Sequence, residues 1–169
     1  MQQNIYLIGF MGTGKSTISH SLATILKYEE IDTDLWITQQ QGKSVTEIFE
    51  LYGEQYFRDL ETECLKQMKM EHHKIISCGG GMVLRKENIT LMKENGVVVL
   101  LTATPNTIFS RVKHGTGRPI LNENMTVEYI SELLQKRSPY YKAAGDITIT
   151  TDYKSPEQIS EEIKNSFDF

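Results

Sequence analysis

The segment GFMGTGKST, residues 9–17, limits what this chain can fold into more than any other part of it. Its Gly9, Gly14, Lys15 and Ser16 fit the pattern G-x-x-x-x-G-K-[ST], a glycine-rich loop that wraps around phosphate groups. Such a loop lies between a strand and a helix, because the N-terminus of the helix attracts the phosphates. The apolar run IYLI comes before it, and apolar residues at helical spacing follow it. The context therefore favours a nucleotide-binding loop over a chance match.

We expect this loop to bind the phosphates of a nucleotide together with Mg²⁺. Backbone N–H groups would contact phosphate oxygens, Lys15 would reach the β- and γ-phosphates, and the Ser16 hydroxyl would bind the cation. The residues expected to contact the nucleotide are Gly12, Thr13, Gly14, Lys15, Ser16 and Thr17. The motif alone does not separate kinases from GTPases or ATPases. We find no guanine-reading NKxD motif, and the chain is short for a large ATPase, so phosphoryl transfer to a small molecule is favoured.

Short apolar runs alternate with amphipathic stretches along the whole chain. Strands are expected at 5–8, 74–77, 97–101 and 146–150, with a weaker candidate at 29–32. Helices are expected at 15–27, 46–48, 54–71, 86–94, 105–113, 127–136 and 155–167. This alternation predicts an α/β fold with three layers, α/β/α, around a five-stranded parallel sheet.

Composition limits the partners and the compartment. A chain of 169 residues is expected to form one domain, and its net charge of −4 without a long basic block argues against nucleic acid as a partner. The two cysteines, Cys64 and Cys78, lack metal-ligand spacing and fit a reduced, cytoplasmic protein. The longest apolar run, 96–101, is too short to cross a membrane, and we see no signal peptide.

Two carboxylates stand at the end of the weaker strand candidate, in the segment Asp32-Thr33-Asp34. Ligands of parallel α/β sheets bind at the carboxyl ends of the strands. Asp32 could therefore hold Mg²⁺ directly or through water, and Asp34 could accept a hydrogen bond, or a proton, from an attacking hydroxyl. A plain Asp-rich turn is an equally good interpretation of these residues alone.

Three further features suggest a second binding site. Arg58 and Glu61 stand three residues apart on an expected helix, where they could form an ion pair, although an isolated pair of this kind is usually a solvated one. Three glycines at 79–81 follow an expected strand and would expose backbone N–H groups. Arg137 precedes Pro139, which is expected to end or kink its helix.

The elements GFMGTGKST, IDTD, FRxxE, SCGGG, RPIL and RSPYY, in this order, resemble the shikimate kinases, from about residue 5 to 152. The resemblance implies transfer of the γ-phosphoryl group of ATP to the 3-hydroxyl of shikimate, a step toward chorismate and the aromatic amino acids. It also implies one P-loop kinase domain over 1–169, with a substrate-binding helical segment at about 33–61 and a mobile lid at about 112–125. We expect a monomer whose partners are ATP and shikimate.

The resemblance assigns roles to individual residues. Asp34 would grip the ring hydroxyls and orient or deprotonate the nucleophile, with Lys15 and Arg118 as the other catalytic residues. The residues implied to bind shikimate are Asp34, Arg58, Gly80, Gly81 and Arg137, with the two arginines on its carboxylate and Glu61 orienting Arg58. Arg118 would reach the phosphates from the lid, Arg111 would stack on adenine, and Ser16 and Asp32 would hold Mg²⁺.

Two alternatives remain open at this point. The chain could be another small P-loop kinase, acting on gluconate or a nucleoside monophosphate, although the arginine pair and the triple glycine weigh against such acceptors. It could also be a weakly active homologue that binds nucleotide as a regulatory module, although Lys15, Asp34 and Arg118 together speak against that.

Overall fold

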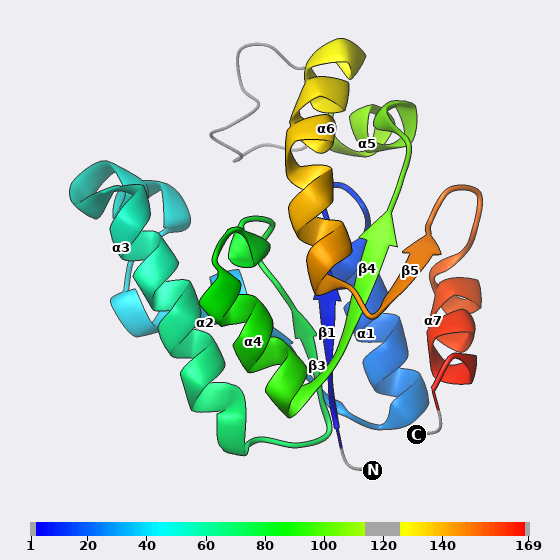
Figure 1. The fold of residues 1–169 in the computed structure, drawn as a ribbon, viewed down its shortest axis with the longest axis horizontal. Coiled ribbons are helices and arrows are strands. Elements are labelled where there is room, and N and C mark those ends of the chain that lie inside the picture. The colour runs from blue at the N-terminus through cyan, green and yellow to red at the C-terminus, as the bar shows by residue number, and fades with distance from the viewer. Residues whose placement is uncertain (1–2, 114–125, 168–169) are drawn as a thin grey trace.

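A five-stranded, fully parallel sheet forms the centre of the computed structural model, which describes residues 3–113 and 126–167 (Figure 1). The strand order is β2-β3-β1-β4-β5. The strands are β1 (Asn4–Ile8), β2 (Glu29–Asp32), β3 (Lys74–Ser77), β4 (Gly96–Thr102) and β5 (Ile147–Thr150). All four pairs are parallel, as the register Ile5 to Ile75 and Ile5 to Val97 illustrates for the central strand. The predicted fold class is confirmed, including the weaker strand candidate.

Helices cover both faces of the sheet, because the central strands are apolar on both. In β1, Tyr6 and Ile8 join one buried cluster, while Ile5 and Leu7 join the other, as expected for side chains that alternate between faces. The helices α1 (Lys15–Leu26) and α7 (Pro156–Asn165) pack together over the second face. The first face is covered by α3 (Val45–Gln67), α4 (Lys86–Asn95) and α6 (Val127–Ala144), and α5 (Pro105–Val112) joins the same buried cluster at the end of the sheet.

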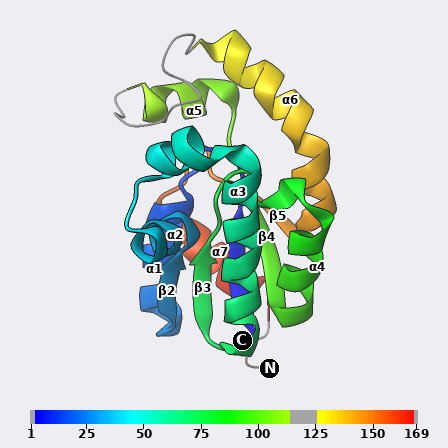
Figure 2. The same cartoon turned by 90° about the vertical axis from the view of Figure 1, so that its left-hand side faces the viewer.

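The carboxyl ends of the strands meet at one end of the molecule. In both Figure 1 and Figure 2, α5 and the first half of α6 rise beyond this end of the sheet. The loops after β1 and β3 open at the same end, and α2 (Thr33–Gln41) begins there directly after β2. This arrangement gathers the sequence motifs at one edge.

Two helices differ from the sequence expectation. Helix α2 was not expected as a separate helix, but the Asp32 side chain caps it by accepting a hydrogen bond from the Leu35 N–H at 3.0 Å. Helix α6 does not end before Pro139 but continues to Ala144, so the expected helix end at residue 136 is wrong. Burial of Tyr141 and Ala144 in the core offsets the backbone hydrogen bond that proline lacks.

Helix α3 contains an interruption. The sequence predicts two separate helical pieces here, at 46–48 and 54–71, and the gap between them is confirmed. Gly53 has a φ of 81° and a ψ of 171°, a backbone conformation that favours glycine, and it divides α3 into two helical segments. Residues 114–125 of the predicted lid, with Arg118, lie outside the described residues. Within the described residues, no helix is both long and apolar enough to span a membrane.

Candidate active site

One cavity of about 840 Å³ is lined by every predicted site residue that the structure describes. Those on its phosphate side are Gly12, Thr13, Gly14, Lys15, Ser16, Thr17, Asp32 and Arg111. Those on its other side are Asp34, Arg58, Gly80, Gly81 and Arg137. Segments separated by more than a hundred residues in sequence therefore meet around one space, as the α/β topology requires at the carboxyl edge of a parallel sheet.

The phosphate loop connects β1 to α1 and is shaped by its glycines. Gly12 and Gly14 have φ of 76° and 96°, and a methyl group at Gly9 would lie 2.4 Å from the Leu101 carbonyl oxygen. Gly14 occupies the N-cap of α1 and has no side chain to cap it, which leaves the first N–H groups of the helix for an anion. The Lys15 Nζ donates to the carbonyls of Gly9 and Phe10 at 2.8 and 3.0 Å, so its charge lies over the loop.

Two oxygen ligands suited to Mg²⁺ stand beside this loop. The Ser16 hydroxyl donates to Asp32 Oδ2 at 3.5 Å, which joins the start of α1 to the end of β2. Within the described residues, no three or more His, Cys, Asp or Glu side chains gather as metal ligands. One hydroxyl and one carboxylate, from Ser16 and Asp32, suit a hard cation that keeps several waters and takes further ligands from nucleotide phosphates, as Mg²⁺ does.

The loop Gly79–Gly81 is glycine-rich because charged side chains fill the space where its own side chains would be. A methyl group at Gly79 would lie 2.7 Å from Asp34 Oδ1 and 2.9 Å from Glu61 Oε1. A methyl group at Gly81 would lie 2.2 Å from Arg58 Nη1. The triple glycine thus lets two carboxylates and one guanidinium approach the backbone closely.

Arg58 and Glu61 form a buried ion pair on α3, so the prediction of an ion pair is confirmed and the solvated alternative is wrong. Arg58 Nη1 donates to Glu61 Oε2 at 2.8 Å, and the Glu61 side chain has 0% exposure. Burial raises the pKa of Glu61 to about 7, against the opposing attraction of Arg58. Burial disfavours the charge on Arg58, but Glu61 and Glu54 outweigh it and raise the pKa of the guanidinium.

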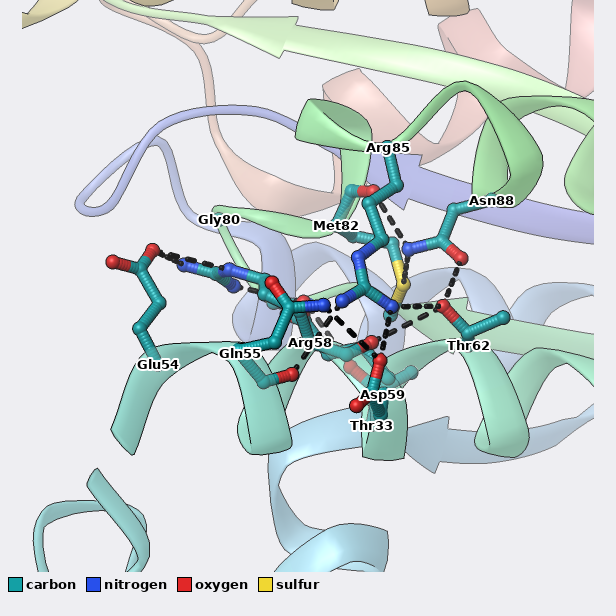
Figure 3. Close-up of polar contacts among 12 residues, drawn as sticks. Thr33, Glu54, Gln55, Arg58, Asp59, Thr62, Gly80, Met82, Arg85 and Asn88 are labelled. Carbon is teal, nitrogen blue, oxygen red and sulfur yellow. Dashed lines mark hydrogen bonds and ion pairs between the residues drawn. The ribbon is translucent and has the colours of Figure 1, made fainter. Parts of the chain in front are cut away.

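Glu54 gives Arg58 a second carboxylate partner. Glu54 lies four residues before Arg58 on α3, and its Oε1 accepts a hydrogen bond from Arg58 Nη2 at 3.1 Å (Figure 3). The fork of the guanidinium is therefore held from both sides, which fixes its plane.

A polar network that was not predicted from the sequence also holds α3 in place (Figure 3). Arg85, after the glycine loop, binds Asp59 Oδ1 of α3 at 2.7 Å. The Thr62 hydroxyl donates to the buried Asn88 at 2.7 Å, and Asn88 Nδ2 donates to the Met82 carbonyl at 3.0 Å. These contacts join α3 to the segment that follows the glycines, and no local sequence signal marks them.

The two remaining arginines approach the cavity from α5 and α6. Arg111 Nη1 donates to the Gly12 carbonyl at 3.1 Å and to Thr151 Oγ1 at 3.0 Å, so it joins the phosphate loop to the segment after β5. The Arg137 guanidinium lies 5.9 Å from the centre of the Phe10 ring. Lys154 and Pro156 also line the cavity.

Comparison with known proteins identifies relatives of this chain. A family model described as shikimate kinase matches residues 11–168. A shikimate kinase of Thermodesulfovibrio yellowstonii is 42% identical over 166 residues, covering 98% of this chain and 95% of that protein. A shikimate kinase of Caldanaerobacter subterraneus subsp. tengcongensis is 41% identical, with 98% and 96% covered.

Solved structures agree with the sequence relatives. A shikimate kinase from Acinetobacter baumannii in complex with shikimate superposes with a TM-score of 0.92 at 30% identity, covering 98% of this chain and 93% of that one. A shikimate kinase from Aquifex aeolicus gives a TM-score of 0.82 at 36% identity, with 96% and 95% covered.

Proposed function

The chain belongs to the shikimate kinase family, and we propose that its cavity transfers the γ-phosphoryl group of ATP to the 3-hydroxyl of shikimate. The products are shikimate 3-phosphate and ADP, in the pathway to chorismate and the aromatic amino acids. One observation carries the assignment of the site: a phosphate loop and a braced Arg58–Glu61 pair face the same cavity. A polyphosphate and a small carboxylic acid can therefore meet there.

On the nucleotide side, backbone N–H groups of Gly12–Thr17 bind the phosphates, and Lys15 offsets charge that develops on the transferred group. Ser16 and Asp32 hold Mg²⁺, which when bound neutralises phosphate oxygens. Arg111, between Gly12 and Thr151, faces the nucleoside end of the ligand.

On the acceptor side, Arg58 and Arg137 bind the carboxylate of shikimate, since guanidinium forks match carboxylates. Backbone N–H groups of Gly80 and Gly81 hold the acceptor in place. Asp34, beside Gly79, accepts a hydrogen bond from the 3-hydroxyl and aligns it for attack on the γ-phosphorus.

Four further parts of the proposal rest on the family resemblance and on the chemistry. A lid at about 112–125 carries Arg118, which meets the phosphates. The helical segment at about 33–61 binds the substrate. The enzyme acts as a monomer. It works in the cytoplasm, where ATP is available.

The decisive test measures ADP release with MgATP plus shikimate, gluconate or AMP in parallel reactions. Stimulation by shikimate alone supports the proposal. Stimulation by gluconate or AMP would indicate a different small-molecule kinase, and stimulation by none would indicate a binding module.

Arg137→Ala tests the acceptor side directly. We expect the KM for shikimate to rise at least tenfold, because half of the carboxylate clamp is gone, while the KM for ATP stays within about twofold. Lys136→Ala is the matched control, since it removes a neighbouring exposed cation of the same helix. A parallel loss of ATP binding in Arg137→Ala would mean that the arginine supports the fold instead.

A further inference from the structure

The glycine loop depends on contacts from other elements for its shape. Glycine restricts the backbone least of all residues, so three in a row at 79–81 do not define one conformation by themselves. Thr33 Oγ1 accepts a hydrogen bond from the Gly79 N–H at 2.9 Å, and the Arg58 guanidinium packs against Gly81. Both of these contacts come from the α2–α3 side of the cavity (Figure 3).

A contact from the opposite side comes from Tyr141 on α6. Its hydroxyl donates to the Gly80 carbonyl oxygen at 2.6 Å, across 61 residues of sequence. The side chain is 4% exposed and belongs to the core cluster on that face of the sheet. Burial raises the pKa of Tyr141, against the opposing charge of Arg137, so the phenol keeps its proton and can donate.

The position of this bond matters because the peptide group is planar. The Gly80 carbonyl and the Gly81 N–H are the two ends of one trans peptide and point in opposite directions. A donor that fixes the carbonyl therefore fixes the direction of the Gly81 N–H. Tyr141 also stands one helical turn after Arg137, so both side chains project from the same face of α6.

We propose that Tyr141 is a positioning residue for the acceptor: it sets the Gly80–Gly81 peptide at a fixed distance from Arg137. The inference rests on the proposed function, because it concerns how the shikimate site is held. Helix α6 thereby supplies Arg137, which binds the carboxylate of the acceptor directly. Through the phenol of Tyr141 it also orients the Gly81 N–H. An acceptor held at both points keeps its hydroxyl aligned with Asp34, and loss of the phenol lets the peptide rotate.

The experiment replaces the hydroxyl and keeps the ring. In Tyr141→Phe we expect kcat/KM for shikimate to fall about tenfold, with the KM for ATP within about twofold of wild type, because a buried acceptor loses its partner. Tyr140→Phe is the matched control: the neighbouring tyrosine is 48% exposed, and its loss of a hydroxyl should change neither constant. Tyr141→Met, which fills an apolar space without a hydroxyl, serves as a second variant if the first does not fold.

The outcomes separate a positioning role from a merely structural one. Thermal unfolding is measured alongside the kinetics, because a structural tyrosine would lower the unfolding temperature and leave the constants of the folded enzyme unchanged. Unchanged shikimate kinetics, or equal losses for shikimate and ATP, would overturn the proposal. If wild type shows no shikimate-dependent ADP release, the proposed function fails first, and the comparison of variants is not reached.

Discussion

Replacing Glu61 with glutamine should remove a pH dependence from the stability of the fold. Glu61 is fully buried, and burial raises its pKa from 4.5 to about 7. Between these values the folded chain holds a proton that the unfolded chain has released. Since the unfolded state then binds fewer protons, the free energy of unfolding of the wild type falls as pH rises from about 4.5 to 7.

The size of the effect follows from the pKa difference. At about 1.4 kcal/mol per unit, a shift from 4.5 to about 7 corresponds to about 3 kcal/mol. Glutamine keeps the size of the side chain and an oxygen that can accept from Arg58, but it has no proton to lose. We therefore expect the stability of Glu61→Gln relative to wild type to improve by about 3 kcal/mol between pH 4.5 and 8.

Urea unfolding at a series of pH values measures this quantity. Other titrating groups contribute equally to both proteins and largely cancel in the difference, provided that they do not contact Glu61. Glu63→Gln, an exposed glutamate on the same helix, is the control and should show a far smaller change with pH. A stability difference between Glu61→Gln and wild type that stays constant from pH 4.5 to 8 would refute the reasoning. A wild type that becomes more stable relative to Glu61→Gln as pH rises would refute it as well.

Two further substitutions test the walls of the cavity. Gly81→Ala should raise the KM for shikimate tenfold or more, because its methyl group would displace the Arg58 guanidinium, from which it would lie only 2.2 Å. The control Gly80→Ala would meet its nearest atoms at 3.8 Å, so its unfolding temperature should stay close to wild type; equal destabilisation by both would contradict this steric account. Arg111→Ala should raise the KM for ATP about tenfold and spare that for shikimate, because it loses the contacts to Gly12 and Thr151. Equal effects on both substrates would show that Arg111 supports the fold instead.

The phosphate loop and the sheet could be predicted because their signals are local. The motif at 9–17 fixes a strand, a turn and a helix in sequence, and continuous apolar runs such as 97–101 are typical of strands buried on both faces. The order of strands is not written in any one segment, but parallel pairing brings all carboxyl ends to one edge. For that reason, motifs from 14 to 137 meet at one cavity.

The errors and omissions have one physical origin, which is that tertiary contacts override local preference. Pro139 predicts a helix end, yet α6 continues because the residues after it are buried in the core. Asp32 predicts an Asp-rich turn or a cation ligand, and only the structure shows that its side chain also caps α2. The bonds of Tyr141 and Asn88 join residues distant in sequence. Although Tyr141 belongs to the RSPYY element, nothing in that element predicts a bond to Gly80.

The three glycines show why the acceptor side cannot be understood from its charged residues alone. Asp34 and Glu61 both place an oxygen within 3 Å of the point where a Gly79 side chain would begin. Their mutual repulsion is one of the causes that raise the pKa of Glu61, so any change that separates the two carboxylates should also relax this shift. A side chain at 79 would force such a separation, whereas one at 80 would not. The backbone of the loop therefore shapes this side of the cavity, and by letting Asp34 approach Glu61 it adds to the pKa shift of Glu61 that burial mainly causes.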